Sequence, residues 1–251
     1  MKFRLDKVLV ERGLATTRTR AQERIMEGQV TVDGTIVTKT GFFVKPIQAV
    51  EVHGDALPYV SRGGIKLAAA LDAWKIDVAG RICLDVGIST GGFSDCLLQR
   101  GAVSVTGIDS GHSQLAATLR NDPRLRLLER TNARFLTAEM LSTGISFFTM
   151  DVSFIAASLV LPAVIAAAFH LGTENPSTNP REAVVLVKPQ YEAGREFVGK
   201  RGIVRSEAAH QLAINRVRQT MSAQGAIETA VMDSPIAGGE GNREFLLYAR
   251  F

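Results

Sequence analysis

Two lysines and two acids stand out in this sequence because of where they lie relative to apolar runs. Asp151 and Lys188 each end an apolar run with the length of a buried strand, Glu244 opens another, and Lys66 precedes the first. A charged side chain at a strand end is costly to remove from water unless it is paired or functional. A structural salt bridge between Asp151 and Lys188 is the plain alternative. With Lys66 and Glu244 added, the set is better suited to move a proton or stabilise a developing negative charge.

A strand, a glycine loop and a helix start follow one another at residues 84–93, Leu-Asp-Val-Gly-Ile-Ser-Thr-Gly-Gly-Phe. Glycine permits close backbone approach, and a helix start offers free N–H groups. The spacing is not the G-x-G-x-x-G of dinucleotide folds. Asp85 lies inside the strand end, where it could attract the sulfonium and amino groups of S-adenosylmethionine. A tight turn with a capping acid is the alternative.

Two more polar residues extend this predicted cofactor site. Asp109 ends the next strand, 24 residues after Asp85, where an acid can accept both ribose hydroxyls. Asn132 follows the third strand, and its donor and acceptor groups suit an adenine edge. The residues expected to hold the cofactor are Asp85, Gly87, Ser89, Thr90, Gly91, Gly92, Phe93, Asp109, Asn132 and Asp151.

The elements that must position these residues alternate between strands and helices from residue 59 to residue 251. Such alternation predicts an open α/β sheet with ligands at the carboxyl ends of its strands. We expect strands at 82–86, 104–109, 125–128, 147–151, 183–188, 227–232 and 244–248, and helices that begin near Ile65, Gly92, Ser113, Ile155 and Ser206.

Residues 1–58 follow a different pattern and predict a small α+β domain. Leu5, Val8 and Leu9 share one helical face, Thr17 could cap a second helix, and residues 30–37 alternate as a hairpin does. Residues 1–24 hold seven basic and three acidic side chains, so this segment carries the whole net charge of +4. A basic face of this kind fits phosphate contact, with a solvated helix surface as the alternative.

The N-terminal region resembles the S4 RNA-binding fold. The residues that match are Arg4-Leu5-Asp6, Val8-Leu9, Gly13-Leu14-Ala15, Thr17-Arg18, Ala21, Gly28, Val30, Val32, Asp33 and Gly34. The resemblance implies that the second helix and the hairpin lie against an RNA backbone. Together with the start of the larger domain, this region supplies the predicted RNA contacts Arg4, Arg18, Arg20, Arg24 and Arg62.

The whole chain resembles the TlyA (hemolysin A) family, which joins an S4 domain to an FtsJ-like methyltransferase domain. The matching stretches are Ser61–Gly64 with Lys66, Leu84–Phe93, Glu129–Asn132, Met150–Phe154, Lys188–Glu192, Ser234–Ile236, Gly241, Asn242 and Glu244. The resemblance implies a Rossmann-like seven-stranded sheet whose last strand is antiparallel. It also implies a catalytic tetrad, Lys66, Asp151, Lys188 and Glu244. Two departures are Ile88, where a small residue is usual, and Ser110, where an apolar one is common.

By this resemblance, the expected activity is S-adenosylmethionine-dependent 2'-O-methylation of a ribosomal RNA ribose, with a cytidine of either subunit as target. Lys188 would accept or steer the hydroxyl proton, Lys66 would stabilise the alkoxide, and Asp151 and Glu244 would orient the amines. The partners would be ribosomal RNA or ribosomal subunits. No metal is expected, because the four histidines are scattered without ligand spacing.

Composition narrows the remaining alternatives. Cys83 and Cys96 lack the spacing of a zinc site or a disulfide framework, which favours a reducing compartment, the cytoplasm. The longest apolar run, 154–169, is too short to span a bilayer, and no apolar leader follows Met1, so no membrane is expected as a partner. A non-catalytic RNA-binding or ribosome assembly factor and a hemolysin-like membrane-active protein are the alternatives. Methylation of a small molecule would leave the N-terminal domain unexplained.

Overall fold

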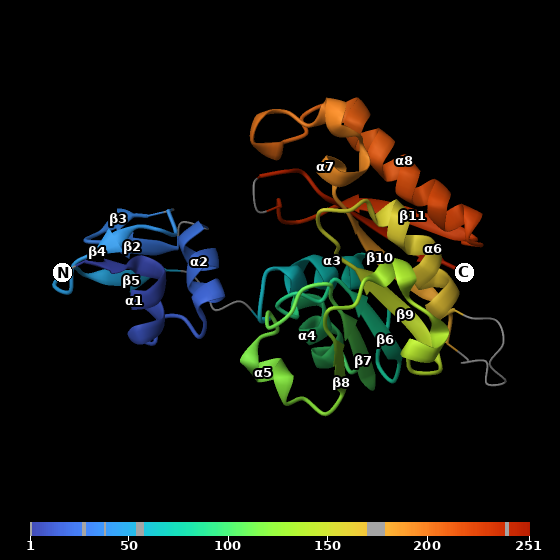
Figure 1. The fold of residues 1–251 in the computed structure, drawn as a ribbon, viewed down its shortest axis with the longest axis horizontal. Helices are drawn as coiled ribbons and strands as arrows, with labels where there is room; N and C mark the ends of the chain where they lie inside the picture. The colour runs from blue at the N-terminus through green and yellow to red at the C-terminus, as the bar shows by residue number, and fades with distance from the viewer. Residues whose placement is uncertain (1, 27–28, 38, 54–57, 170–178, 239–240) are drawn as a thin grey trace. The chain divides into compact units, whose positions relative to one another are not determined.

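The computed structural model describes residues 2–26, 29–37, 39–53, 58–169, 179–238 and 241–251. The chain divides into two compact units, Met1–Pro58 and Tyr59–Phe251 (Figure 1). Each unit has a hydrophobic core of its own.

The first unit packs two helices against short antiparallel strands. Leu5, Leu9 and Ile25 are fully buried in its core. The strands form a three-stranded sheet in the order β3-β2-β5 and a separate pair, β1-β4. The elements are β1 (Phe3–Arg4), α1 (Leu5–Glu11), α2 (Arg18–Met26), β2 (Val30–Val32), β3 (Thr35–Ile36), β4 (Phe43–Val44) and β5 (Val50–Val52).

Local side-chain chemistry sets two boundaries in this unit. The Arg20 backbone N–H donates to Thr17 Oγ1 at 3.1 Å, so Thr17 caps α2 as predicted. Asp33 and Gly34 have φ of 49° and 77°, the left-handed pair that a two-residue hairpin turn requires. The predicted second helix and hairpin are therefore confirmed.

The second unit is built on a seven-stranded sheet in the order β11-β12-β10-β9-β6-β7-β8. β12 runs antiparallel to both of its neighbours, and β9, β6, β7 and β8 continue from β10 in parallel. The predicted sheet with an antiparallel last strand is confirmed. The strands are β6 (Ile82–Val86), β7 (Ser104–Ile108), β8 (Leu125–Leu128), β9 (Ile145–Met150), β10 (Glu182–Val187), β11 (Glu228–Asp233) and β12 (Phe245–Arg250).

Helices cover both faces of this sheet. Successive strand residues point to opposite faces, so Cys83 packs in one core cluster while Leu84 and Val86 pack in the other. The Cys83 side is covered by α3 (Gly63–Trp74), α4 (Gly92–Gln99) and α5 (Ala117–Arg120), and the other by α6 (Ala157–Ala168), α7 (Pro189–Glu192) and α8 (Glu207–Ala223). Short 3-10 turns lie at Ala133–Phe135, Ala138–Met140, Arg195–Phe197 and Lys200–Gly202.

One helix boundary differs from the prediction. The helix expected near Ser113 begins at Ala117, because Ser113 has φ of 58° and therefore cannot continue a right-handed helix. In the described part of the chain, none of the helices combines the length and apolar character that crossing a membrane requires.

Candidate active site

Two ion pairs gather the four predicted catalytic side chains at one edge of the sheet. Lys188 Nζ lies 2.6 Å from Asp151 Oδ1, and Lys66 Nζ lies 2.6 Å from Glu244 Oε2. Asp151 and Lys188 directly follow the parallel strands β9 and β10, whereas Glu244 directly precedes the antiparallel β12. The ends of β9 and β10 and the start of β12 meet at one edge, and α3 brings Lys66 to the same edge.

The two pairs differ in their access to solvent. The side chains of Lys66 and Glu244 are 11% and 3% exposed, so their pair is largely removed from water. The side chains of Lys188 and Asp151 are 13% and 25% exposed, and Lys188 Nζ also donates to Ser153 Oγ at 2.8 Å. The two lysine side chains are thus about equally exposed, and the pairs differ in their carboxylates, because Asp151 lines the cavity described below and Glu244 does not.

A cavity of about 330 Å³ opens beside Asp151 at the carboxyl ends of β6, β7 and β9. This is within the range of small-molecule sites. Of the predicted cofactor residues, Gly87, Ser89, Asp109, Asn132 and Asp151 line it. Among the lining residues that sequence reasoning did not assign to the cofactor site are Gly111, Gln114, Thr131, Ser153 and Phe154, several of which flank the motifs it used.

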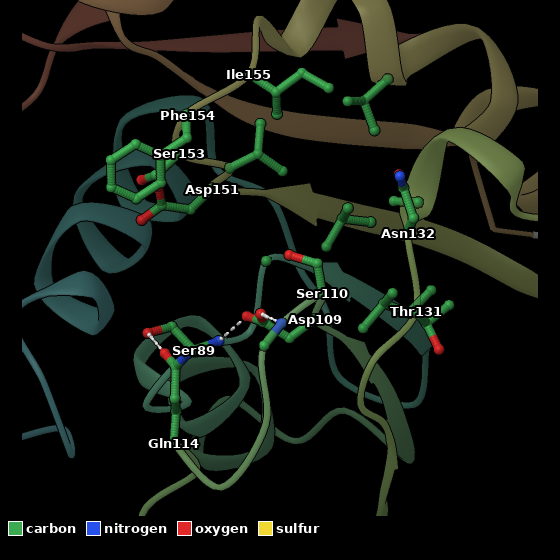
Figure 2. A pocket seen from close by; sticks show the side chains of 17 residues that line it. Ser89, Asp109, Ser110, Gln114, Thr131, Asn132, Asp151, Ser153, Phe154 and Ile155 are labelled. Carbon is green, nitrogen blue, oxygen red and sulfur yellow. Dashed lines mark hydrogen bonds between the residues drawn. The ribbon is translucent and has the colours of Figure 1, made fainter.

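Asp109 organises the polar side of this cavity (Figure 2). Its Oδ2 accepts the Ser89 backbone N–H at 2.8 Å, and its Oδ1 accepts the Gly111 backbone N–H at 2.7 Å. Ser89 Oγ also donates to Gln114 Oε1 at 3.0 Å. A carboxylate offers about four lone-pair sites, so Asp109 retains capacity for two ligand hydroxyls.

Asn132 lies at the opposite end of the same cavity lining from Ser89 (Figure 2). Its Oδ1 accepts the Arg134 backbone N–H at 3.0 Å, which caps the short helix at residues 133–135. The amide N–H2 group and one remaining lone pair of Oδ1 are then left for a ligand, so the donor and acceptor that the sequence suggested both remain available.

Asp85 is absent from the cavity lining, and the cofactor contact expected for it stays a prediction. It is fully buried, and its carboxylate accepts hydrogen bonds from Ser94 Oγ at 2.7 Å and Thr149 Oγ1 at 2.9 Å. Burial raises the pKa of Asp85 to about 6, and these two hydroxyls only partly offset that effect. Through these two hydroxyls, Asp85 ties β6 to α4 and β9.

This raised pKa makes the stability of the second unit depend on pH. An acid whose folded pKa exceeds its ordinary value of 3.8 binds more protons when folded, so stability falls as pH rises from about 4 to 6. We expect Asp85→Asn to raise the free energy of unfolding above pH 6 by up to about 3 kcal/mol, with no difference below about pH 4. Urea titrations followed by Trp74 fluorescence would measure this, with Asp77→Asn as the exposed control. A pH-independent difference would contradict the expectation.

The glycines of the loop after β6 allow other parts of the protein to pack close to its backbone. A Cβ at Gly91 would lie 2.4 Å from Leu119 Cδ1, and one at Gly92 would lie 2.2 Å from Ser61 Oγ. At Gly87, a Cβ would lie 2.3 Å from the Asp151 carbonyl oxygen. Thr90, Gly91, Gly92 and Phe93 do not line the cavity, and their cofactor contacts stay predictions. The missing side chains at Gly91 and Gly92 let α5 and α3 pack closely against the loop.

The departure at Ile88 is accommodated in the core. Its side chain is buried and would contact any Cβ at Gly107, with Cδ1 only 2.3 Å from that position. A bulky residue in the loop is thus matched by a missing side chain on β7. Ile88 is absent from the cavity lining, whereas the other departure, Ser110, belongs to it.

Phe154 is an aromatic side chain that sequence reasoning placed in a motif but gave no role. It lines the cavity, is 91% exposed and has φ of 65°, an unusual value for a bulky residue. Its ring centroid lies 5.7 Å from that of Tyr191, at 49° between planes. Strained backbone at an exposed aromatic is typical of functional sites, and this pair stands beside the Lys188–Asp151 ion pair.

The arginines predicted to contact RNA have different environments. Asp6 is fully buried and accepts hydrogen bonds from Arg4, Arg18 and Gln22, and the Arg4 guanidinium holds its pKa well below the usual range. The Arg4 and Arg18 side chains are still 36% and 51% exposed. Arg20 is different, because its side chain is only 10% exposed and pairs with Glu23, which leaves little surface for a phosphate.

Arg24 and Arg62 complete the predicted RNA-contacting set. Arg24 lies in α2 and Arg62 directly precedes α3, and both are half-buried. Their roles stay predictions. Across the described ranges, no three His, Cys, Asp or Glu side chains are grouped as metal ligands would be.

Comparison with known proteins assigns the chain to a family. Residues 59–251 match the FtsJ-like methyltransferase family, and residues 3–48 match the S4 domain. The chain is 42% identical to the 16S/23S rRNA (cytidine-2'-O)-methyltransferase TlyA of Mycobacterium tuberculosis, over 99% of this chain and 90% of that protein. It is 37% identical to Hemolysin A of Brachyspira hyodysenteriae, over 98% of this chain and 99% of that protein.

A solved structure from Streptococcus thermophilus that carries a hemolysin name has the same fold. It covers 99% of this chain and 88% of its own, with a TM-score of 0.75 and 37% identity. Relatives over nearly the full length and matches to both domains point the same way. The chain is a methyltransferase of the TlyA family, in which an S4 domain is joined to an FtsJ-like methyltransferase domain.

Proposed function

We propose that the protein transfers a methyl group from S-adenosylmethionine to the 2'-hydroxyl of a ribosomal RNA nucleotide in the cytoplasm, with a cytidine as the target. The observation that carries this proposal is the Lys188–Asp151 ion pair, which stands at the edge of a cavity lined by Asp109. A relative named as a 16S/23S rRNA (cytidine-2'-O)-methyltransferase supports the choice of substrate.

The cavity fits the proposed cofactor in size and in chemistry. Asp109 retains acceptor capacity for two ribose hydroxyls, and the Asn132 amide suits an acceptor on an adenine ring. Asp109 and Asp151 give the cavity negative charge, which favours a cationic ligand. S-adenosylmethionine, when bound, supplies a methyl group on a positively charged sulfur.

The residues at the sheet edge have separable tasks in this proposal. Asp151 and Ser153 fix Lys188 Nζ by two contacts, so Nζ can be held against the ribose hydroxyl. As the ribose oxygen attacks the methyl carbon, its proton passes to Lys188 Nζ in the neutral amine form, and the Asp151 carboxylate stabilises the ammonium that results. Lys66 adds positive charge behind the reacting oxygen, and Glu244 fixes its orientation. Holding the reacting atoms in line contributes roughly 7 to 11 kcal/mol in such reactions.

RNA recognition is shared between the two units in this proposal. Arg4 and Arg18 present half-exposed guanidinium groups around Asp6, which suit backbone phosphates. Phe154 and Tyr191 offer aromatic surface next to the reaction centre, where an unstacked base can lie. The S4 domain would bring ribosomal RNA to the chain, and the aromatic pair would hold the target nucleotide.

Methyl transfer to ribosomal subunits from a strain lacking the gene tests this function. With labelled S-adenosylmethionine, we expect label in ribosomal RNA and one or more new 2'-O-methylated cytidines. Asp109→Ala should raise the Kd for the cofactor on the order of tenfold to a hundredfold, because the carboxylate can no longer accept two ribose hydroxyls. Ser110→Ala changes a neighbouring lining residue and serves as control. Unlabelled RNA with wild-type enzyme, or label on the bases, would contradict the proposal.

A further inference from the structure

A basic segment, residues 195–205, connects the end of α7 to the start of α8. It holds four cations and one acid, namely Arg195, Lys200, Arg201, Arg205 and Glu196, so its net charge is +3. All five side chains are exposed. Within the described ranges, no acidic side chain forms an ion pair with any of the four cations. Nearby Arg243, in contrast, is paired with both Asp233 and Glu207.

The backbone of the basic segment is held by one buried side chain. Asn242 is 3% exposed, its Nδ2 donates to the Gly202 carbonyl at 2.9 Å, and its Oδ1 accepts the Val204 backbone N–H at 2.9 Å. Val204 itself is buried, and its carbonyl lies 3.1 Å from His210 Nε2. A segment with a fixed backbone and exposed cations is a preformed surface for anions.

The basic segment is connected to the proposed catalytic residues in two ways, through the chain that precedes it and through Asn242. The chain enters from Lys188 through α7, and Asn242 is two residues before Glu244. Figure 1 shows the segment as the orange loop between α7 and α8, beside the red chain that leads to β12. The part of the segment at Gly202 and Val204 is therefore fastened two residues from Glu244, which directly precedes β12.

We propose that the basic segment binds RNA phosphates next to the target nucleotide, and that Asn242 positions it against the reaction centre. The proposal rests on the function above, because only a nucleic acid substrate carries phosphates on both sides of a reacting ribose. Phe197 is exposed within the same segment and adds aromatic surface, a combination that favours RNA over an acidic protein. Such cations position the RNA without reading its sequence.

The test compares Lys200→Ala/Arg205→Ala with a control, Arg126→Ala/Arg250→Ala, which removes two exposed cations elsewhere, of which Arg250 is paired with Glu228. For ribosomal subunits, we expect the first variant to raise KM about fivefold to twentyfold, far more than it lowers kcat. In a plot of the logarithm of RNA affinity against the logarithm of salt concentration, the slope should become less steep. We expect a change of roughly one unit for each phosphate that the variant no longer binds. The same KM and slope in both double variants would overturn the proposal.

Asn242 requires a separate readout because it lies close to Glu244. Asn242→Ala should raise KM, and adding it to Lys200→Ala/Arg205→Ala should have little further effect, since cations in a released segment contribute little. Additive effects on KM would overturn the positioning role. If wild-type enzyme methylates no RNA, the proposed function fails. Filter binding of ribosomal RNA to the same variants would still decide whether the basic segment contacts it.

Discussion

Lys188→Ala is expected to lower kcat for methyl transfer by about a thousandfold or more while S-adenosylmethionine still binds. The substitution removes the amine that Asp151 and Ser153 fix at the cavity edge. Directed proton transfer contributes roughly a hundredfold to ten-thousandfold, and lost orientation adds to this. Cofactor affinity should stay within about twofold, because Lys188 does not line the cavity. Single-turnover assays with labelled cofactor and calorimetric titration measure the two quantities.

Lys188→Arg provides the matched control for charge. An arginine retains positive charge but carries a planar, permanently protonated group in place of a compact ammonium. If the charge alone matters, Lys188→Arg regains most of the activity. We expect instead that proton steering requires an amine, so that Lys188→Arg does not regain the activity. Turnover by Lys188→Ala at the wild-type rate would remove Lys188 from the reaction.

Glu244→Ala is expected to have the largest effect on folding stability among the four charged residues. It leaves the Lys66 ammonium buried without its carboxylate, and breaking a buried pair from one side costs about 3 to 5 kcal/mol. The single tryptophan, Trp74, lies at the end of α3, the helix that carries Lys66, and its ring is 5.5 Å from Tyr248 on β12. Urea unfolding followed by Trp74 fluorescence therefore reports on this region directly.

Replacing both partners separates stability from activity. Lys66→Met/Glu244→Leu substitutes apolar groups for a buried pair, a change that is often neutral or stabilising. We expect the double variant to regain most of the lost free energy of unfolding and to remain inactive. A double variant that recovers stability and methyl transfer together would show that the pair serves only the fold.

The order of elements was predictable because apolar runs and their polar ends mark strands clearly. The run at residues 145–150 is buried throughout, and Asp151 follows it at once, as the sequence indicates. Where the sequence pattern was weaker, a predicted helix boundary was wrong. The polar stretch from Asp109 to Gln114 has no apolar period, and Ser113 takes a left-handed conformation, which delayed the helix to Ala117. Helix α7 has only four residues, too few for any period to show.

Ion pairing at the site was predictable from topology, whereas the cofactor contacts were less so. Neighbouring strands bring Asp151, Lys188 and Glu244 to one edge whatever their side-chain rotamers. For Asp85 and Gly91, in contrast, the same sequence pattern fits either ligand contact or internal packing. Asp85 accepts hydrogen bonds from the hydroxyls of Ser94 and Thr149, and Leu119 lies close to Gly91. Such distant partners do not show in local sequence.

The position of β12 has a consequence for how the enzyme is made. β12 is the last strand of its sheet to be synthesised, yet it lies between β10 and β11. Until its residues leave the ribosome, β11 has no neighbour in this sheet, and Lys66 lacks a carboxylate that follows it 178 residues later. The reaction centre therefore assembles only after all seven strands of the sheet have been synthesised, because Glu244 directly precedes the last of them.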